Sequence, residues 1–95
     1  MLSTNNVYED SKLLSCPITQ DIFIEPVVAS DGFSYEKYAI QNVLNSTTPV
    51  SPMTRRPLHK TLYPNYSIKN IIDELKKTSQ EFQDQYNESY DNLPD

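Results

Sequence analysis

Residues 15–77 decide the fold, and they read SCPITQDIFIEPVVASDGFSYEKYAIQNVLNSTTPVSPMTRRPLHKTLYPNYSIKNIIDELKK. Within this stretch Asp31 and Gly32 stand between two apolar runs, PVVA over residues 26–29 and FSY over residues 33–35. An Asp-Gly pair between apolar runs predicts a tight β-hairpin turn. Gly32 is the only glycine in the chain, which fits a turn position that needs a positive φ angle.

Two helices and a third strand are expected around this hairpin, which gives an α+β fold. Ser34 is placed to cap a helix over about residues 35–44, where apolar residues recur at i, i+3 and i+4. A second, amphipathic helix after Ser67 carries Ile and Leu at i, i+3, i+4 and i+7. Before it, residues 59–63 are expected to form a short strand. Three prolines make residues 47–58 a rigid, irregular loop.

The composition divides the chain into three segments. Residues 1–12 are polar and aperiodic, which predicts a flexible N-terminal segment. Residues 13–77 form the predicted domain, and residues 78–95 are an acidic extension or linker. Three aromatic residues recur at intervals of four in that last segment. They indicate either a helix that packs on the domain or a partner, or a frayed linker, and both alternatives stay open.

The bulk properties exclude several functions. A chain of 95 residues makes one small domain, and a net charge of −5 argues against binding nucleic acid through clustered Lys and Arg. No run approaches the roughly 18 apolar residues that a membrane span needs, and residues 1–10 show no export signal. A single cysteine excludes an internal disulfide and fits a reducing compartment. We therefore expect a cytoplasmic protein, in a host cell if it is a pathogen effector.

Several short motifs follow one another in a fixed order along this stretch. They are C-P-I-T, E-P-V-V, S-D-G-F-S-Y-E-K, a helical run, S-P-M-T-R-R-P-L, Y-P-N and an Ile-rich helix. In that order and at that spacing the sequence resembles the U-box, the zinc-free relative of the RING finger in ubiquitin ligases. The resemblance implies a small U-box/RING-like fold with a β-hairpin, a third strand, a central helix, a C-terminal amphipathic helix and two long loops.

The composition leaves no ligands for the zinc sites of a RING finger. A structural zinc needs four Cys or His ligands, and the chain offers only Cys16 and His59, so we expect neither metal nor cofactor. Cys16 lies in the apolar segment LLSCPI, far along the chain from His59, and reads as a buried structural cysteine rather than a thioester-forming nucleophile. Hydrogen bonds among short polar side chains should replace the metal. The candidates in the two loop regions are Glu25, Asp31, Ser34, Ser51 and Thr54.

The resemblance also implies a shallow surface that binds a ubiquitin-conjugating enzyme. It assigns Ile18 and Gln20 in the first loop, Val43 in the central helix, and Pro52 and Met53 in the second loop. A few exposed apolar anchors beside prolines suit a small, weak interface. Ile18 and Val43 can alternatively be core residues. Gln20 is polar where many family members carry a large apolar side chain, and Val43 stands where an aromatic residue or His is frequent.

The function that the resemblance implies is that of an E3 ubiquitin-protein ligase module. Such a RING/U-box-type transferase has no nucleophile of its own; it orients the ubiquitin thioester of the conjugating enzyme toward a substrate lysine. Arg55 matches the linchpin that contacts both ubiquitin and the enzyme, unless it is an ordinary surface arginine. The alternative, which Gln20 favours, is a degenerate U-box that binds a substrate or scaffold without ligase activity. The expected partners are the conjugating enzyme, ubiquitin and an unidentified substrate, with the oligomeric state left open.

Overall fold

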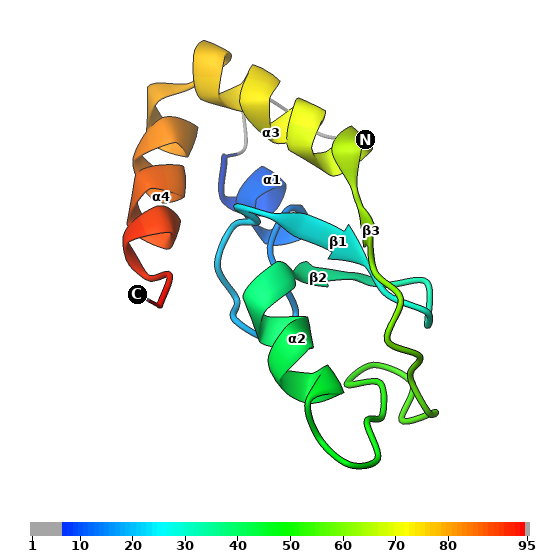
Figure 1. Cartoon of the computed structure of the whole chain (residues 1–95). Helices are drawn as coiled ribbons and strands as arrows, with labels where there is room; N and C mark the ends of the chain where they lie inside the picture. The colour runs from blue at the N-terminus through cyan, green and yellow to red at the C-terminus, as the bar shows by residue number, and fades with distance from the viewer. Residues whose placement is uncertain (1–6, 95) are drawn as a thin grey trace.

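The fold is α+β, with a small antiparallel sheet surrounded by helices (Figure 1), as the sequence predicted. The computed structural model describes residues 7–94. The helices are α1 (Val7–Leu13), α2 (Lys37–Leu44), α3 (Tyr66–Thr78) and α4 (Gln80–Asp91), and the strands are β1 (Pro26–Val28), β2 (Ser34–Glu36) and β3 (Tyr63–Pro64). No helix in this described part of the chain is both long and apolar enough to cross a membrane.

The hairpin forms where Asp31 and Gly32 predict it. Strands β1 and β2 pair antiparallel, with Val27 opposite Tyr35. Gly32 has a φ of 84°, in the left-handed region that favours glycine. The Asp31 side chain accepts the N–H of Phe33 at 2.9 Å, so both turn residues act through their local chemistry.

The third strand completes the sheet in the order β2-β1-β3. It is shorter and later than residues 59–63, because only Tyr63 and Pro64 pair with β1. The chain before it is held elsewhere: the N–H of His59 donates to Ser30 Oγ at 2.9 Å rather than to a strand. The expectation of a strand beginning at His59 is therefore wrong.

Helices α2 and α3 begin at different N-cap residues from those that the sequence suggested. Ser34 lies in β2, so α2 starts only at Lys37, and Glu36 occupies its N-cap without a side-chain capping bond. Helix α3 starts at Tyr66 and is capped by Asn65, whose Oδ1 accepts the N–H of Ile68 at 3.0 Å. The amide carbonyl of Asn65 is thus the acceptor for the first turn, and Ser67 is not the cap.

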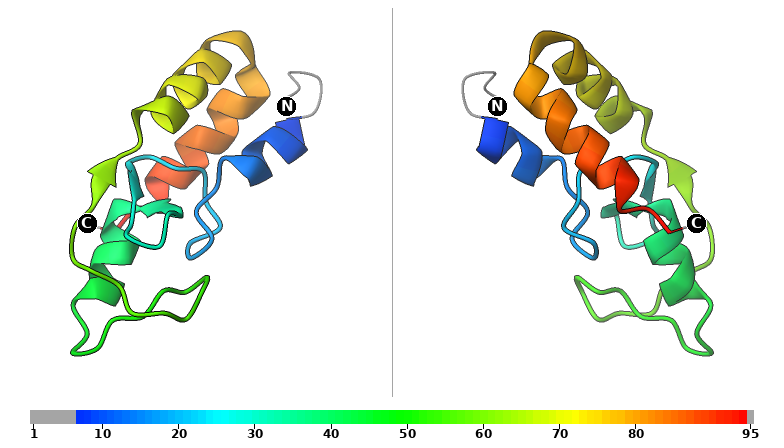
Figure 2. Two further views of the ribbon diagram at one scale, coloured as in Figure 1. Left: turned by 90° about the vertical axis from the view of Figure 1, so that its right-hand side faces the viewer. Right: turned by 90° about the vertical axis from the view of Figure 1, so that its left-hand side faces the viewer.

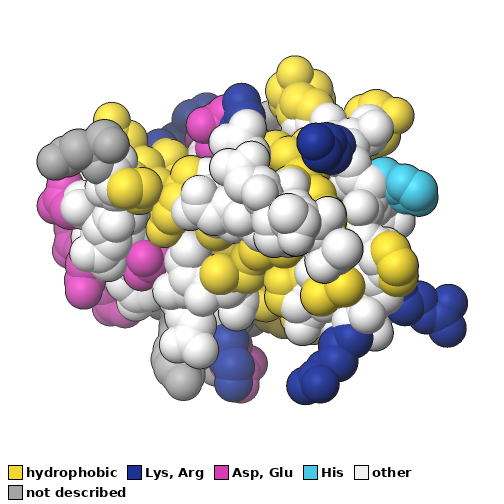
Figure 3. Space-filling view, turned by 60° about the horizontal axis from the view of Figure 1, so that its bottom comes forward, with side chains coloured by type: hydrophobic (Ala, Val, Ile, Leu, Met, Phe, Trp, Pro, Cys, Tyr) yellow, Lys and Arg dark blue, Asp and Glu magenta, His cyan; other side chains and the backbone are white. Residues whose placement is uncertain are grey.

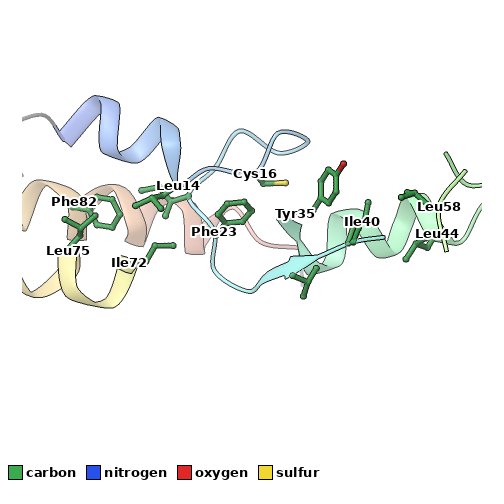
Figure 4. Close-up of a cluster of buried hydrophobic side chains, with 13 residues drawn as sticks. Leu14, Cys16, Phe23, Tyr35, Ile40, Leu44, Leu58, Ile72, Leu75 and Phe82 are labelled. Carbon is green, nitrogen blue, oxygen red and sulfur yellow. The ribbon is translucent and has the colours of Figure 1, made fainter. Parts of the chain in front are cut away.

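The apolar core runs through the molecule as a continuous row of side chains (Figure 4). Figure 4 shows it extending from Phe82 and Leu75 through Leu14, Ile72, Phe23, Cys16, Tyr35 and Ile40 to Leu44 and Leu58. Cys16 is 1% exposed, so its interpretation as a buried cysteine is confirmed. Helices α2, α3 and α4 and strands β1 and β2 each contribute side chains to this core.

The first and last helices pack against each other. The sequence predicted a flexible segment over residues 1–12, but Val7–Leu13 forms α1, with acidic residues in its first turn and Lys12 in its last, an order that the helix dipole favours. Residues 1–6 lie outside the described residues. Helix α4 contacts both α1 and α3, and Figure 2 shows it alongside α3.

The aromatic residues of α4 show whether this segment is a packed helix or a frayed linker, the two alternatives that the sequence left open. Phe82 is 1% exposed, and Tyr86 packs against the core with Lys76 3.9 Å from its ring centroid, whereas Tyr90 is exposed. Ser11 Oγ donates to Gln85 Oε1 at 2.6 Å and joins α1 to α4. The segment is a packed helix, and a frayed linker does not describe residues 80–91.

Candidate functional site

Two loops of the same construction project from one side of the molecule (Figure 2). We call residues 15–22 loop 1 and residues 50–57 loop 2; in each, an isolated antiparallel bridge joins the first residue to the last. The segments inside the bridges read CPITQD and SPMTRR. Pro in second place and Thr in fourth are shared, so the loops invite comparison position by position.

The fifth position of each hexapeptide has a left-handed backbone. Gln20 has a φ of 63° and Arg55 a φ of 65°, and they are the only positive-φ residues other than glycine among residues 7–94. Each closes one helical turn: Gln20 N–H donates to Cys16 O at 2.8 Å, and Arg55 N–H donates to Ser51 O at 2.9 Å. A left-handed non-glycine residue costs free energy, so the surrounding bonds must hold it in place.

In loop 1 the first residue of the hexapeptide, Cys16, stabilises the turn through its sulfur atom. Cys16 Sγ accepts the N–H of Ile18 at 3.4 Å and the N–H of Glu36 at 3.2 Å. These weak hydrogen bonds join the loop to the end of β2. Cys16 therefore fixes the backbone that carries Ile18.

The matching position of loop 2 is braced by oxygen. Ser51 is 1% exposed, and its Oγ accepts the N–H groups of Met53 at 3.0 Å and Thr54 at 2.9 Å. The same hydroxyl donates to Asp31 Oδ2 at 2.6 Å, and Tyr35 donates to that oxygen at 2.5 Å. One carboxylate thereby ties the hairpin turn, the core and loop 2 together.

These bonds shift two pKa values in opposite directions. Burial alone raises the pKa of Asp31, but hydrogen bonds from Ser51, Tyr35 and the Phe33 N–H outweigh it and lower that pKa below its ordinary value. Burial, together with the hydrogen bond to Asp31, raises the pKa of Tyr35 to about 12. At neutral pH the network therefore contains an ionised carboxylate and a neutral phenol.

A buried carboxylate at the end of β2 holds the backbone that follows loop 1. Glu36 is 2% exposed, and its two oxygens accept the N–H groups of Ile24 and Glu25, each at 2.7 Å. Sequence reasoning missed this residue, because a Glu at the end of an alternating strand reads as a solvent-facing side chain. No local pattern in the sequence indicates that this carboxylate is buried.

The predicted polar candidates divide into network members and surface residues. Asp31 and Ser51 are joined as described, and every buried side-chain N or O atom described in residues 9–94 has a hydrogen-bond partner. Ser34 instead accepts from the Asn65 amide at 2.9 Å, outside that network. The Glu25 side chain forms an exposed ion pair with Lys37 at 3.4 Å, and its backbone N–H alone joins the Glu36 brace.

Within residues 7–94 no three His, Cys, Asp or Glu side chains are grouped so that they could hold a metal ion.

Thr54, the remaining polar candidate, closes loop 2 in the way that Thr19 closes loop 1. Thr54 Oγ1 accepts the N–H of Arg56 at 3.2 Å, as Thr19 Oγ1 accepts the N–H of Asp21 at 3.2 Å. The two loops therefore share this Thr bond and the backbone bonds of the turn, whereas the bonds to the side chains of Cys16 and Ser51 differ. Satisfied networks of this kind stabilise a loop without an ion.

The candidate docking residues lie on and between the two loops. Ile18 is 38% exposed in loop 1, and Met53 is 48% exposed in loop 2, each large and apolar. Gln20 and Pro52 are exposed as well, whereas Val43 on α2 is half-buried against the core. Figure 3 shows hydrophobic side chains in the middle of this face, with Lys and Arg toward its edge.

Arg55 is exposed, and its side chain forms no ion pair among the described residues. Its backbone is nevertheless fixed by the left-handed turn and by the bond to Ser51. Residues 45–64 contain Arg55, Arg56 and Lys60 but no Asp or Glu. The guanidinium group thus stands free on a rigid loop in a locally basic region.

The architecture defines a class of small domains in which two loops are braced around a hairpin by hydrogen bonds instead of metal. The sequence profile of the U-box domain matches residues 12–81. The chain belongs to the U-box family.

Curated relatives agree with this family. The chain is 46% identical over 61 residues to U-box domain-containing protein 57 of Arabidopsis thaliana, 63% of this chain and 16% of the relative. It is 42% identical over 66 residues to WD repeat, SAM and U-box domain-containing protein 1 of Gallus gallus, 68% of this chain and 14% of the relative. U-box domain-containing protein 35 of Arabidopsis thaliana is 44% identical over 64 residues, 66% of this chain and 8% of the relative. The matches therefore span less than a fifth of each relative.

Proposed function

We propose that this chain is an E3 ubiquitin-protein ligase module. It binds a ubiquitin-conjugating enzyme and promotes transfer of ubiquitin from the enzyme's thioester to a substrate lysine. U-box domains are typically modules of this kind, and the family membership supports the proposal. We place the activity in the cytoplasm, where the single thiol stays reduced.

The observation that carries the proposal is the pair of exposed apolar side chains on two braced loops. Ile18 and Met53 are held on rigid backbones, although neither contributes to the core. Because the backbones of both loops are already ordered, binding costs little backbone entropy, so a small interface suffices. Gln20, Val43 and Pro52 complete the proposed contact area.

The proposed mechanism uses orientation rather than acid–base chemistry. The nucleophile is the substrate lysine, the thioester belongs to the conjugating enzyme, and the buried Cys16 takes no part. Arg55 would hydrogen-bond to both ubiquitin and the enzyme through its planar fork of donors, and so hold the thioester in a reactive arrangement. The restricted freedom of the bound ubiquitin accounts for the acceleration.

A discharge assay tests the proposal. Conjugating enzymes charged with ubiquitin are mixed with free lysine, with and without the chain, and the loss of thioester is followed in time. We expect acceleration with at least one member of a broad panel. If no member is accelerated, the ligase proposal fails.

The second candidate is a U-box that binds protein without ligase activity. Gln20 favours it, because an exposed polar side chain at this position offers less apolar contact to a conjugating enzyme. Affinity measurements with uncharged conjugating enzymes separate the two functions. Binding without discharge, or no binding at all, favours the second.

A further inference from the structure

The last helix reaches back into loop 1 through a buried hydrogen bond. Ser89 on α4 is 6% exposed, and its Oγ accepts the backbone N–H of Ile22 at 3.0 Å. Just after α4, the Asn92 side-chain amide donates to Asp21 Oδ1 at 3.2 Å. Two contacts from one end of α4 therefore fall on neighbouring residues of loop 1.

These contacts fall on the last two residues of loop 1, Asp21 and Ile22, which pair with the start of the loop. The N–H of Cys16 donates to Asp21 O at 2.9 Å, and the N–H of Phe23 donates to Leu14 O at 3.0 Å. Ile22, between them, sits in the bridge position whose N–H points away from the partner strand. That outward N–H is the group that Ser89 binds.

We propose that Ser89 is a positioning residue for loop 1, and that α4 sets the backbone on which Ile18 is presented. The proposal rests on the proposed function, because the position of Ile18 matters only if loop 1 docks on a conjugating enzyme. The U-box profile ends at residue 81, so Ser89 lies outside the segment that matches the family. The docking surface thus depends on the part of α4 that lies beyond that segment.

The physical reason is the burial of the Ile22 N–H. Without Ser89 Oγ this donor has no acceptor, and an unpaired buried donor is costly. The loop relieves the cost by moving outward until water reaches the N–H. Because the bridge and the Cys16–Asp21 bond link both limbs of loop 1, such a movement also displaces Ile18.

The experiment compares Ser89→Ala with Ser89→Thr, which keeps the hydroxyl, and with Ser67→Ala, the same change at an exposed site on α3. Amide hydrogen exchange is measured at Ile22 and at Ala29, whose N–H is bonded within the hairpin. In Ser89→Ala we expect exchange at Ile22 to be faster by about tenfold or more, with little change at Ala29. Ser89→Thr should restore slow exchange, and Ser67→Ala should match the wild type.

The same variants are then assayed with a conjugating enzyme. Ser89→Ala should weaken affinity for the uncharged enzyme by about three- to tenfold, while discharge at saturating enzyme stays near the wild-type rate. A purely structural role would instead lower the melting temperature and speed exchange at Ala29 as much as at Ile22, and that result overturns the proposal. Unchanged exchange at Ile22, or unchanged affinity, overturns it as well.

If the Ser89→Ala variant does not fold, Asn92→Ala tests the same proposal. Its bond to Asp21 is exposed, so the fold should persist while exchange at Ile22 rises by a smaller factor. Wild-type exchange and affinity in Asn92→Ala would then overturn the proposal. Failure of the proposed function looks different: the wild-type chain binds no conjugating enzyme, although Ser89→Ala still speeds exchange at Ile22.

Discussion

Ile18 combines exposure with a fixed backbone, and this combination separates binding from stability. Ile18→Ala should leave the chain folded but weaken binding to a conjugating enzyme by about 2 kcal/mol or more, as expected for an interface anchor. Leu14→Ala is the matched control, because Leu14 is 4% exposed in the core. That change should cost about 2–5 kcal/mol of folding free energy. Titration calorimetry measures the binding free energy, and thermal melts measure stability. A large loss of stability in Ile18→Ala would show that Ile18 is a core residue rather than an interface anchor.

Arg55 has a side chain proposed for activity on a backbone that disfavours any side chain. Arg55→Gly removes the guanidinium group and relieves the left-handed conformation, so stability should stay within about 1 kcal/mol of the wild type or rise. Discharge of the thioester should still fall by about tenfold or more, equal to about 1.4 kcal/mol.

Two further variants assign the loss to the guanidinium group. Arg55→Lys should recover only part of the rate, because an ammonium group cannot reproduce the planar fork of donors. Arg56→Ala should have the smaller effect. A normal discharge rate in Arg55→Gly would make Arg55 an ordinary surface residue, and greater damage in Arg56→Ala would shift the role to its neighbour.

At the scale of elements, the start of α3 depends on one side chain with two partners. Asn65 Oδ1 caps the helix, and Asn65 Nδ2 donates to Ser34 Oγ at 2.9 Å. Asn65→Ala should therefore destabilise the chain by about 1 kcal/mol or more, measured by urea denaturation. Ser67→Ala should change stability little. If the two variants ranked in the opposite order, the cap would lie at Ser67 after all.

Elements with local signals could be predicted from the sequence. Asp31 and Gly32 specify the hairpin through their own turn chemistry, and the Ile periodicity specifies α3. The caps were misplaced because Ser34 and Ser67 are also good capping residues; the backbone conformations of the neighbouring residues decide between such candidates. Asp31 and Ser51 were identified as network candidates from their loop positions.

The remaining features depend on contacts between distant residues. The burial of Glu36 arises from two backbone donors more than ten residues earlier, and no local pattern indicates it. The hydrogen bond that joins α4 to loop 1 links Ser89 to Ile22, which are 67 residues apart. The docking surface itself could be proposed only from the resemblance, since exposure of Ile18 and Met53 has no signature in a single sequence.

At the scale of the whole molecule, the Asp31–Tyr35 pair limits the pH range of the fold. The folded pKa of Asp31 lies below its ordinary value of 3.8, so its contribution is present above that pH and is lost as pH falls through the folded pKa. The folded pKa of Tyr35 is raised from 10.0 to about 12, so its contribution is complete below pH 10.0 and disappears as pH rises toward 12.

Denaturation measured across the pH range checks both limits. Asp31→Asn should flatten the acid limb, and Tyr35→Phe should flatten part of the alkaline limb. Burial also raises the pKa values of Tyr38 and Tyr86, so some alkaline dependence should persist in Tyr35→Phe. An alkaline limb unchanged by Tyr35→Phe would contradict the assignment.

The shared construction of the two loops has a consequence for how this surface can change. CPITQD and SPMTRR adopt the same turn while displaying Ile and Gln in one case and Met and Arg in the other. The same backbone shape thus accepts different side chains: Pro and Thr recur at the second and fourth positions, and the third and fifth positions vary. Substitutions at those two positions can therefore change partner preference, while the buried first positions, Cys16 and Ser51, keep their different hydrogen bonds to the residues beneath the loops.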